Sequence, residues 1–198
     1  MGLREEKKAA LRVRLHATAS AMFRERGFDG TRIKDVIDEV GVSEATFFNY
    51  FPNKEAVLHH SARQTKDLYG IYLVHLLARA DEPVIDRLHE LTRTMAAVCA
   101  ADRDLMATVL SRTSLFTGAT GEDEATDKEN YERLAELFRQ GQERGEIGSA
   151  HDVTQLAELF IAVHTLTITN WATRYWGDTG ELEPRLSAAL DVLLRGCT

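Results

Sequence analysis

The part of this chain that most constrains its fold is residues 31–50, where two short helical patterns meet at a single glycine. The first segment repeats apolar side chains at helical spacing, and Thr31 stands where an N-cap is expected. Gly41 breaks that segment, Ser43 can cap a second short helix, and Pro52 stops it. Two helices joined by such a turn form a helix-turn-helix, whose second helix can enter the major groove of DNA. Short helices joined at glycine also occur in plain bundles, so the pattern alone leaves both alternatives open.

Helices are expected on both sides of this motif. Apolar side chains keep one face from about Glu5 to Arg26, and Gly27 ends that helix so that Phe28 can contact Phe23. A further helix is expected from Asn53 to about Ala80, followed by four or five longer ones. Since 44% of the residues are apolar and only three are proline, we predict an all-α chain with a substantial core.

The charges are distributed unevenly along the chain. Residues 1–66 hold 12 basic and 9 acidic side chains, a balance of +3, whereas residues 67–198 hold 12 and 22, a balance of −10. An acidic protein with a relatively basic N-terminal part is expected if only that part approaches a polyanion.

Two basic residues stand at unusual places. Arg32 and Lys54 each follow directly after an expected N-cap, where the helix dipole opposes a positive charge. A DNA phosphate at each helix start would supply the missing negative charge. The alternative is a pair of solvated surface cations at a cost of a few tenths of a kcal/mol.

Two sequence segments resemble a known family. GVSEATFFNYFPNKEAV, from Gly41 to Val57, is similar to the recognition-helix signature of the tetracycline-repressor (TetR) family, and FRERGFDGTRIKDVIDEV, from Phe23 to Val40, is similar to its first two helices. The resemblance covers roughly residues 10–60. It implies an all-α protein with a DNA-binding domain at 1–66 and a ligand-binding and dimerisation domain at 67–198. It further implies a homodimer on a palindromic double-stranded DNA operator.

The resemblance also implies a set of DNA contacts. Side chains near the helix starts would hold phosphates, and the outward face of the recognition helix would meet base edges. The family usually has Tyr where this chain has Phe48, so a hydroxyl contact is lost there, and Phe48 is expected against a thymine methyl or a sugar. The expected contact residues are Thr31, Arg32, Ser43, Glu44, Ala45, Thr46, Phe48, Asn49, Tyr50 and Lys54.

Asn49 is the best candidate for reading a base, because its amide can pair bidentately with adenine. Glu44 can accept from cytosine or exclude wrong sequences. The alternative for Asn49 is a solvent-facing helix residue without a partner. Phe47 and Phe51, on the opposite face, are expected in the core.

The C-terminal part carries two apolar helical patterns that favour a dimer. Residues 152–176 are apolar on more than one face, and leucines share one face of 182–194. We expect these helices to pair with a second copy in a four-helix interface, the alternative being the core of one large monomeric bundle. The expected interface residues are Phe160, Val163, Leu186, Leu190 and Leu193.

A ligand cavity is expected in the same part, for a small and largely apolar effector. Its candidate lining residues are Met95, Cys99, Phe116, Phe138, His164, Thr167 and Trp171. His164 and Thr167 lie on an otherwise apolar segment and are natural polar anchors, although polar contacts across a dimer seam explain them equally well. Residues 118–124 are expected to form a loop.

Other classes of function find little support in the sequence. We find no phosphate-binding glycine loop, nucleophile elbow or metal-ligand spacing, and expect neither enzyme activity nor cofactor nor metal. The two cysteines lie far apart and no signal peptide or membrane-spanning segment is evident, so a soluble cytoplasmic protein is expected. A helical interaction module without DNA binding remains the alternative. The resemblance favours repression relieved by a ligand, with activation also possible.

Overall fold

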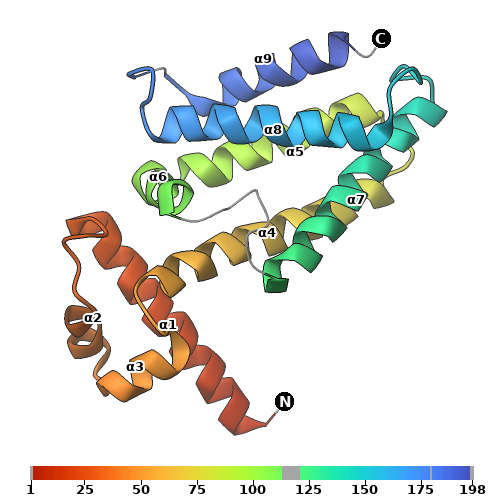
Figure 1. Ribbon diagram of the computed structural model, residues 1–198. Helices are drawn as coiled ribbons and strands as arrows, with labels where there is room; N and C mark the ends of the chain where they lie inside the picture. Colours follow the sequence, from red (N-terminus) through yellow and green to blue (C-terminus); the bar gives the residue numbers. More distant parts are fainter. Residues whose placement is uncertain (1, 113–120, 179, 197–198) are drawn as a thin grey trace.

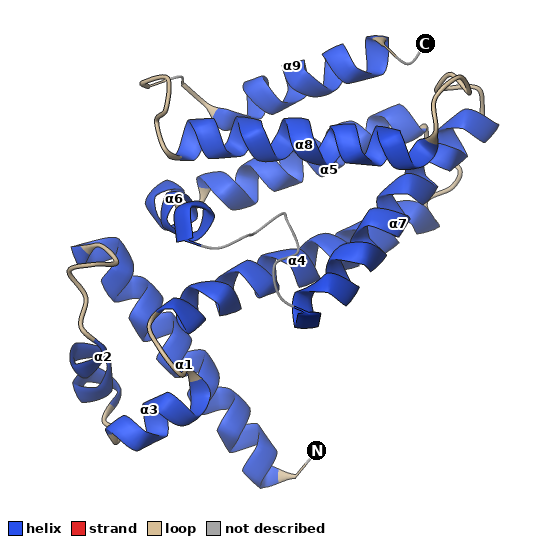
Figure 2. Ribbon diagram, in the orientation of Figure 1, coloured by secondary structure: helices blue, strands red, loops and turns tan. Residues whose placement is uncertain are grey.

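The structure is a computed structural model that describes residues 2–112, 121–178 and 180–196, with side chains from 124 onward in the second range. The described residues form helices and loops without any strand, as Figure 2 shows, which confirms the expected all-α fold. The helices are α1 (Leu3–Arg26), α2 (Ile33–Val40), α3 (Glu44–Tyr50), α4 (Glu55–Ala78), α5 (Val84–Ala100), α6 (Arg103–Arg112), α7 (Gly121–Glu143), α8 (Val153–Ala172) and α9 (Leu182–Arg195). We call α1–α3 the head and α5–α9 the body; α4 runs from one to the other (Figure 1).

The turn between α2 and α3 follows the sequence pattern. Gly41 adopts φ 71° and ψ 43°, the left-handed conformation that favours glycine, and it ends α2. Ser43 caps α3 by accepting a hydrogen bond from the Thr46 amide at 3.1 Å. The start of α2 differs from expectation, because its N-cap is Arg32 and not Thr31.

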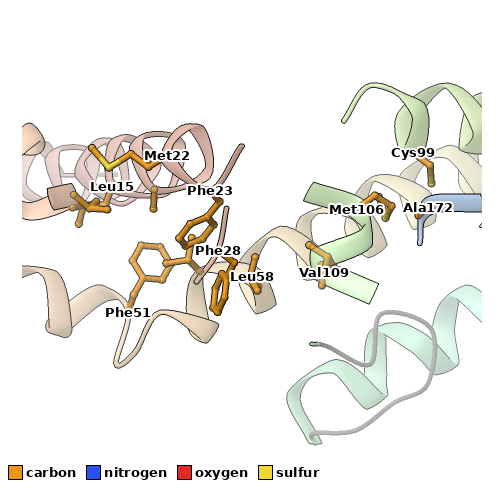
Figure 3. Packing of buried hydrophobic residues seen from close by; sticks show 14 of the residues in the cluster. Leu15, Met22, Phe23, Phe28, Phe51, Leu58, Cys99, Met106, Val109 and Ala172 are labelled. Atoms are coloured by element: carbon orange, nitrogen blue, oxygen red, sulfur yellow. The ribbon is translucent and has the colours of Figure 1, made fainter. Parts of the chain in front are cut away.

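The head is held together by aromatic side chains. The Phe23 and Phe28 rings lie 5.0 Å apart, which confirms the expected contact after Gly27. Figure 3 shows Phe23, Phe28 and Phe51 grouped between α1 and the start of α4, with Val109 of α6 further along the same cluster. This apolar cluster is continuous from the head into the body, so the two parts share one core.

The body surrounds a second apolar cluster. In Figure 1, α8 and α9 lie one above the other, and α7 crosses α4. Leu186, Leu190 and Phe160 are fully buried in this single chain. The loop expected over 118–124 is wrong for its second half, because α7 already begins at Gly121, and residues 113–120 lie outside the described residues.

Contacts within one turn of α4 join it closely to α7. A Cβ atom at Gly70 would lie 2.3 Å from Asn130 Oδ1, so only glycine allows this approach. Asn130 Nδ2 donates to the Lys66 carbonyl at 2.9 Å, and Lys66 Nζ donates to Asp127 Oδ2 at 2.8 Å. These contacts fix the middle of α4 against α7.

A second connection between head and body is made by α6. Arg112, at the end of α6, donates to both carboxylate oxygens of Asp29 at 2.9 and 2.8 Å. Its guanidinium also lies 4.6 Å from the centroid of the Phe28 ring. At the other end, Arg24 of α1 pairs with Asp102 at 3.2 Å. The turn before α2 is therefore tied to the body as well as to α4.

Candidate DNA-binding surface and ligand cavity

The recognition-helix candidate, α3, presents one face to solvent. Phe47 is 1% exposed and packs against Phe51, as expected from the sequence, whereas Phe48 is 39% exposed. Glu44, Ala45 and Asn49 are exposed with it. Because the buried side chains fix the rotation of α3, the residues expected to meet base edges share the solvent-facing side.

The ammonium of Lys54 is bonded to main-chain carbonyls and is not a solvated surface cation. It donates to the Phe28 carbonyl at 2.6 Å and the Thr31 carbonyl at 3.0 Å, and lies 4.2 Å from the centroid of the Phe28 ring. The N-cap of α4 is Lys54, one residue later than expected, and Asn53 accepts from the Ala56 amide at 2.8 Å just before the helix. Lys54 therefore fastens the turn between α1 and α2 to the start of α4.

Thr31 is turned away from solvent. It is 2% exposed, and its hydroxyl donates to the carbonyls of Met22 at 3.1 Å and Gly27 at 2.9 Å. A phosphate contact through this hydroxyl, which the resemblance implied, conflicts with that arrangement. The Thr31 hydroxyl therefore fastens the turn after α1 to the last turns of that helix.

The remaining expected phosphate contacts lie near the two helix starts. Arg32 is exposed at the start of α2, while Thr46 and Tyr50 are partly buried along α3. The Ser43 and Thr46 hydroxyls lie 2.7 Å apart at the start of α3. This arrangement is compatible with an anion at the start of α3, where main-chain amides point outward.

A cavity of about 740 Å³ lies between α4, α5, α7 and α8. Its volume falls in the range of sites that bind small molecules, which is roughly 300–1,000 Å³. The wall is mainly apolar. Its lining residues are Thr65, Lys66, Leu68, Tyr69, Tyr72, Leu91, Thr94, Met95, Val98, Cys99, Asp127, Asn130, Tyr131, Glu158, Phe160, Ile161, Ala162, His164, Thr165, Leu166 and Thr169.

The expected ligand residues divide between this cavity and the core. Met95, Cys99 and His164 line it. Phe138 is fully buried in the body cluster instead. Trp171 packs in the other cluster and donates from Nε1 to the Gly180 carbonyl at 2.9 Å. Sequence periodicity had marked both aromatics as apolar without separating wall from core.

Two further expected ligand residues do not line the described cavity. Thr167 is absent from its wall, although it lies on α8 between residues that form it. Phe116 lies outside the described residues.

His164 is not the polar anchor that the sequence suggested. Its Nδ1 donates to the Phe160 carbonyl at 2.8 Å, and its Nε2 accepts from the Thr92 hydroxyl at 3.0 Å. Burial lowers the pKa of His164 to about 4, so the ring is neutral near pH 7. Both nitrogens are used within the protein, and the imidazole serves to join α5 to α8.

The polar groups that sequence reasoning missed lie mostly on α4 and α7. Lys66 and Asp127 form an ion pair across the cavity wall, and their side chains are 8% and 25% exposed. The Tyr69 and Thr165 hydroxyls are buried without a hydrogen-bond partner among the described residues. A lysine and a tyrosine three residues apart share a helix face, which could have indicated that this side of α4 is unusual.

Cys99 is a wall residue without reactive character. Burial raises the pKa of its thiol to about 12, so the thiol stays protonated near pH 7.

The outer faces of α8 and α9 carry exposed apolar side chains. Leu159 and Leu166 are 49% and 62% exposed on α8, and Val192 is 72% exposed on α9. Phe160, Leu186 and Leu190 were expected at a dimer interface, but they fill the core of the single chain. The expectation failed because the leucine face of α9 packs on α5 and α8 of the same chain. Val163 and Leu193 are partly buried.

Neither a metal site nor a membrane span is found in the described part of the chain. No three His, Cys, Asp or Glu residues there are grouped closely enough to hold a metal ion. No helix in that part combines the length and apolar character needed to cross a bilayer.

Comparisons with known proteins give matches along most of the chain. Residues 15–60 match the family described as bacterial regulatory proteins, tetR family, and residues 81–196 match the tetracyclin repressor-like C-terminal domain. No curated protein matches the chain.

Solved structures provide further similarities. The chain is 26% identical to Thermus thermophilus FadR, a TetR family transcriptional repressor solved in complex with lauroyl-CoA, with a TM-score of 0.70 and coverage of 93% of this chain and 94% of that one. It is 19% identical to Bacillus subtilis FadR, solved in complex with stearoyl-CoA, with a TM-score of 0.67 and coverage of 94% and 99%. A Rhodococcus protein of unknown function is 22% identical, with a TM-score of 0.70 and coverage of 94% and 95%.

Proposed function

Because the chain belongs to the TetR family of bacterial regulatory proteins, we propose that it is a transcriptional repressor that binds a palindromic operator as a homodimer and is released by a small molecule. The observation that carries the proposal is the exposed face of α3, opposite the buried Phe47, in a chain that also holds a cavity against α4. Residues 1–66 would form the DNA-binding part, and residues 67–198 the ligand-binding and dimerisation part. The boundary falls inside α4.

The proposed DNA contacts are residues of the head whose side chains are not committed to contacts inside the protein. Glu44, Ala45, Phe48 and Asn49 face the bases from α3. The proposed phosphate contacts are Arg32, Ser43, Thr46, Tyr50 and Lys54. Lys54 keeps one ammonium proton for a phosphate after its two bonds to carbonyls, so it contributes less than an uncommitted lysine would. Thr31 is withdrawn from the set, since its hydroxyl is bonded inward.

The proposed dimer uses the outer faces of α8 and α9. Leu159, Val163 and Leu166 follow one another at helical spacing along α8, and Val192 is exposed on α9. A two-fold axis would place the same apolar patch of two copies together. Two recognition helices separated by one turn of DNA, roughly 34–36 Å, could then enter successive major grooves.

The proposed effector has a long apolar part. The Thermus thermophilus relative holds lauroyl-CoA, whose acyl chain is apolar. The cavity of this chain has a mainly apolar wall and a volume of about 740 Å³, which suits such a group. A ligand that binds better to a dimer with another head spacing disfavours the DNA-bound state by its difference in affinity.

The proposal is tested by selecting genomic DNA fragments that the purified protein retains. We expect the retained fragments to share an inverted repeat, protected as two half-sites about one helical turn apart. Affinity for that repeat should fall steeply with added salt, since phosphate contacts release counterions. Retention without any shared sequence would overturn the operator, and no retention at all would favour a helical interaction module.

A further inference from the structure

Two of the helices around the cavity each contribute a hydroxyl group that lacks a hydrogen-bond partner in the described part of the chain. Tyr69 belongs to α4 and Thr165 to α8, and both hydroxyl oxygens are buried without a hydrogen-bond partner among the described residues. Buried polar groups are normally paired, so an unpaired hydroxyl on a cavity wall is available to a ligand. Burial raises the pKa of Tyr69 above its ordinary value, which keeps the phenol protonated and able to donate.

A neighbouring tyrosine shows the contrast. Tyr72 lines the same cavity, but its hydroxyl donates to Glu90 Oε1 at 2.5 Å. Tyr72 therefore has no free donor to offer, and the two tyrosines on adjacent turns of α4 differ in what they can do for a ligand.

The charges of the wall oppose an anion. Among the described residues of the wall, Lys66 is the single lysine, and there is no arginine. The Lys66 ammonium already donates to Asp127 Oδ2 at 2.8 Å. Glu158 adds a second carboxylate, and His164 is neutral. Residues 113–123, whose side chains lie outside the described residues, include no lysine or arginine in the sequence. A ligand carboxylate or phosphate would lose its hydration without gaining an unpaired cation, and this makes its binding unfavourable.

We propose that the effector of this chain is an uncharged, largely apolar molecule with a carbonyl oxygen, which accepts hydrogen bonds from Tyr69 and Thr165. The Lys66–Asp127 pair sets this preference, because it neutralises the cation that an acid or a coenzyme A thioester would need. The inference rests on the proposed function in taking the cavity as the effector site. The proposed effector resembles the relative's ligand in its apolar chain and differs from it in having no charged part.

The preference is tested with three probes of equal chain length: methyl decanoate, decanoate and decanoyl-CoA. Their affinities at pH 7.5 are measured by displacement of Nile red, an uncharged dye, from the full-length protein. We expect the ester to bind at least tenfold more tightly than either anion, equal to about 1.4 kcal/mol. Equal or tighter binding of an anion would overturn the proposal, as would displacement by none of the three.

Variants test the residues directly. Tyr69→Phe and Thr165→Val should each weaken ester binding by about fivefold to tenfold, and Tyr175→Phe, a control at an exposed tyrosine outside the cavity wall, should change it by less than about twofold. The melting temperature of ligand-free Tyr69→Phe should equal or exceed that of the wild type, since a buried unpaired hydroxyl is removed. A lower melting temperature with unchanged ester affinity would show that Tyr69 is merely structural.

Asp127→Asn tests the charge argument. With its partner neutral, Lys66 would attract an anion, so the ratio of decanoate to ester affinity should rise at least tenfold. An unchanged ratio in folded protein would refute the role of the pair. If this variant does not fold, the comparison of the three probes on the wild type decides the point. These ligand affinities are measured without DNA, so their outcome is independent of whether the protein binds an operator. A failure of the ligand proposal can therefore be distinguished from a failure of the proposed function.

Discussion

Single residues that look alike in the sequence have different surroundings in the structure. Arg32 and Lys54 both stand near helix starts, yet Arg32 is exposed and Lys54 is bonded to two carbonyls. The sequence shows that a cation opposes each helix dipole, but not whether a long side chain can reach back to a neighbouring turn. In the same way, the sequence indicates that His164 is unusual on an apolar helix, whereas its satisfied partners depend on the packing of α5 and α8.

The two cations should therefore separate in experiments. Lys54→Met should lower the free energy of unfolding by about 1–2 kcal/mol, because two hydrogen bonds from a charged donor are lost. Arg32→Ala should leave stability within about 0.5 kcal/mol of the wild type but reduce the salt dependence of DNA binding by about one unit. Urea unfolding and salt titrations of operator affinity check both. Full stability of Lys54→Met would contradict the role of Lys54 in the head.

Asn49 is expected to contribute specificity. Asn49→Ala should cost about 1–3 kcal/mol at one base position in each half-site and leave non-specific affinity nearly unchanged, since the side chain is exposed on the α3 face. Binding to a panel of operators with single substitutions measures this. An equal loss on every sequence would mean that Asn49 positions the DNA backbone only.

His164 should make stability depend on pH. Burial lowers the pKa of His164 from 6.5 to about 4, so between these values the unfolded chain binds more protons than the folded one. Stability is therefore lost as pH falls through this window, by on the order of 2 kcal/mol between pH 7.5 and pH 5 from this residue. His164→Gln should flatten the dependence in urea unfolding. His16, whose pKa is likewise lowered to about 4, should retain part of it.

At the scale of helices, periodicity predicts their existence and leaves their partners undetermined. The apolar spacing gave the head helices to within a few residues, because Gly41, Ser43 and Asn53 end or begin helices through local chemistry. The leucine face of α9 was also correct as a face. Which neighbour this face covers depends on tertiary packing. The spacing of the leucines is the same whether the helix packs on the core of its own chain or on a second copy. The same limit explains why Phe138 and Trp171 were expected at the cavity.

The close approach of α4 and α7 can be tested at Gly70. Gly→Ala in a helix usually stabilises by roughly 0.5–1 kcal/mol, but here the added Cβ would lie 2.3 Å from Asn130 Oδ1. Asn130 cannot move without weakening its bond to the Lys66 carbonyl. We therefore expect Gly70→Ala to destabilise the protein by about 1–3 kcal/mol.

Thermal unfolding measures the effect of this substitution. Gln64→Ala, at an exposed position of α4, is the control and should stay within about 0.5 kcal/mol of the wild type. A gain in stability on Gly70→Ala would show that the two helices can separate at little cost.

At the scale of the whole molecule, the proposed DNA contacts and the proposed dimer surface lie in different parts of the chain. Residues 1–66, which contain the proposed DNA contacts, carry a net positive charge. The exposed apolar side chains of the proposed dimer surface lie on α8 and α9 in the body. Sequence composition indicated the first of these surfaces. It could not locate the second, because the residues left exposed on α8 are known only after its buried face is fixed.

The proposed dimer should respond to charges on these outer faces. Leu159→Glu combined with Val192→Glu should give folded monomers, since both side chains are exposed in the single chain and would be buried against a partner. Leu190→Glu should instead prevent folding, because Leu190 is fully buried within the chain. Sedimentation and circular dichroism distinguish the outcomes, and Val74→Glu, on exposed α4 surface, serves as control. A wild type that sediments as a monomer at micromolar concentration would refute the dimer.

The attachment of α4 to α7 near Lys66 makes α4 a lever with its fulcrum in the cavity wall. At a rise of 1.5 Å per residue, the 11 residues from Lys66 back to Glu55 form an arm of about 17 Å. A tilt of about 6° at the fulcrum moves the far end of that arm by about 2 Å in this geometry. The arm ends next to Lys54, whose ammonium donates to the carbonyls of Phe28 and Thr31. A tilt of α4 would therefore move the turn that precedes α2 and, with it, α2 and α3. In a symmetric pair both arms swing together, and the distance between recognition helices changes by up to twice that amount.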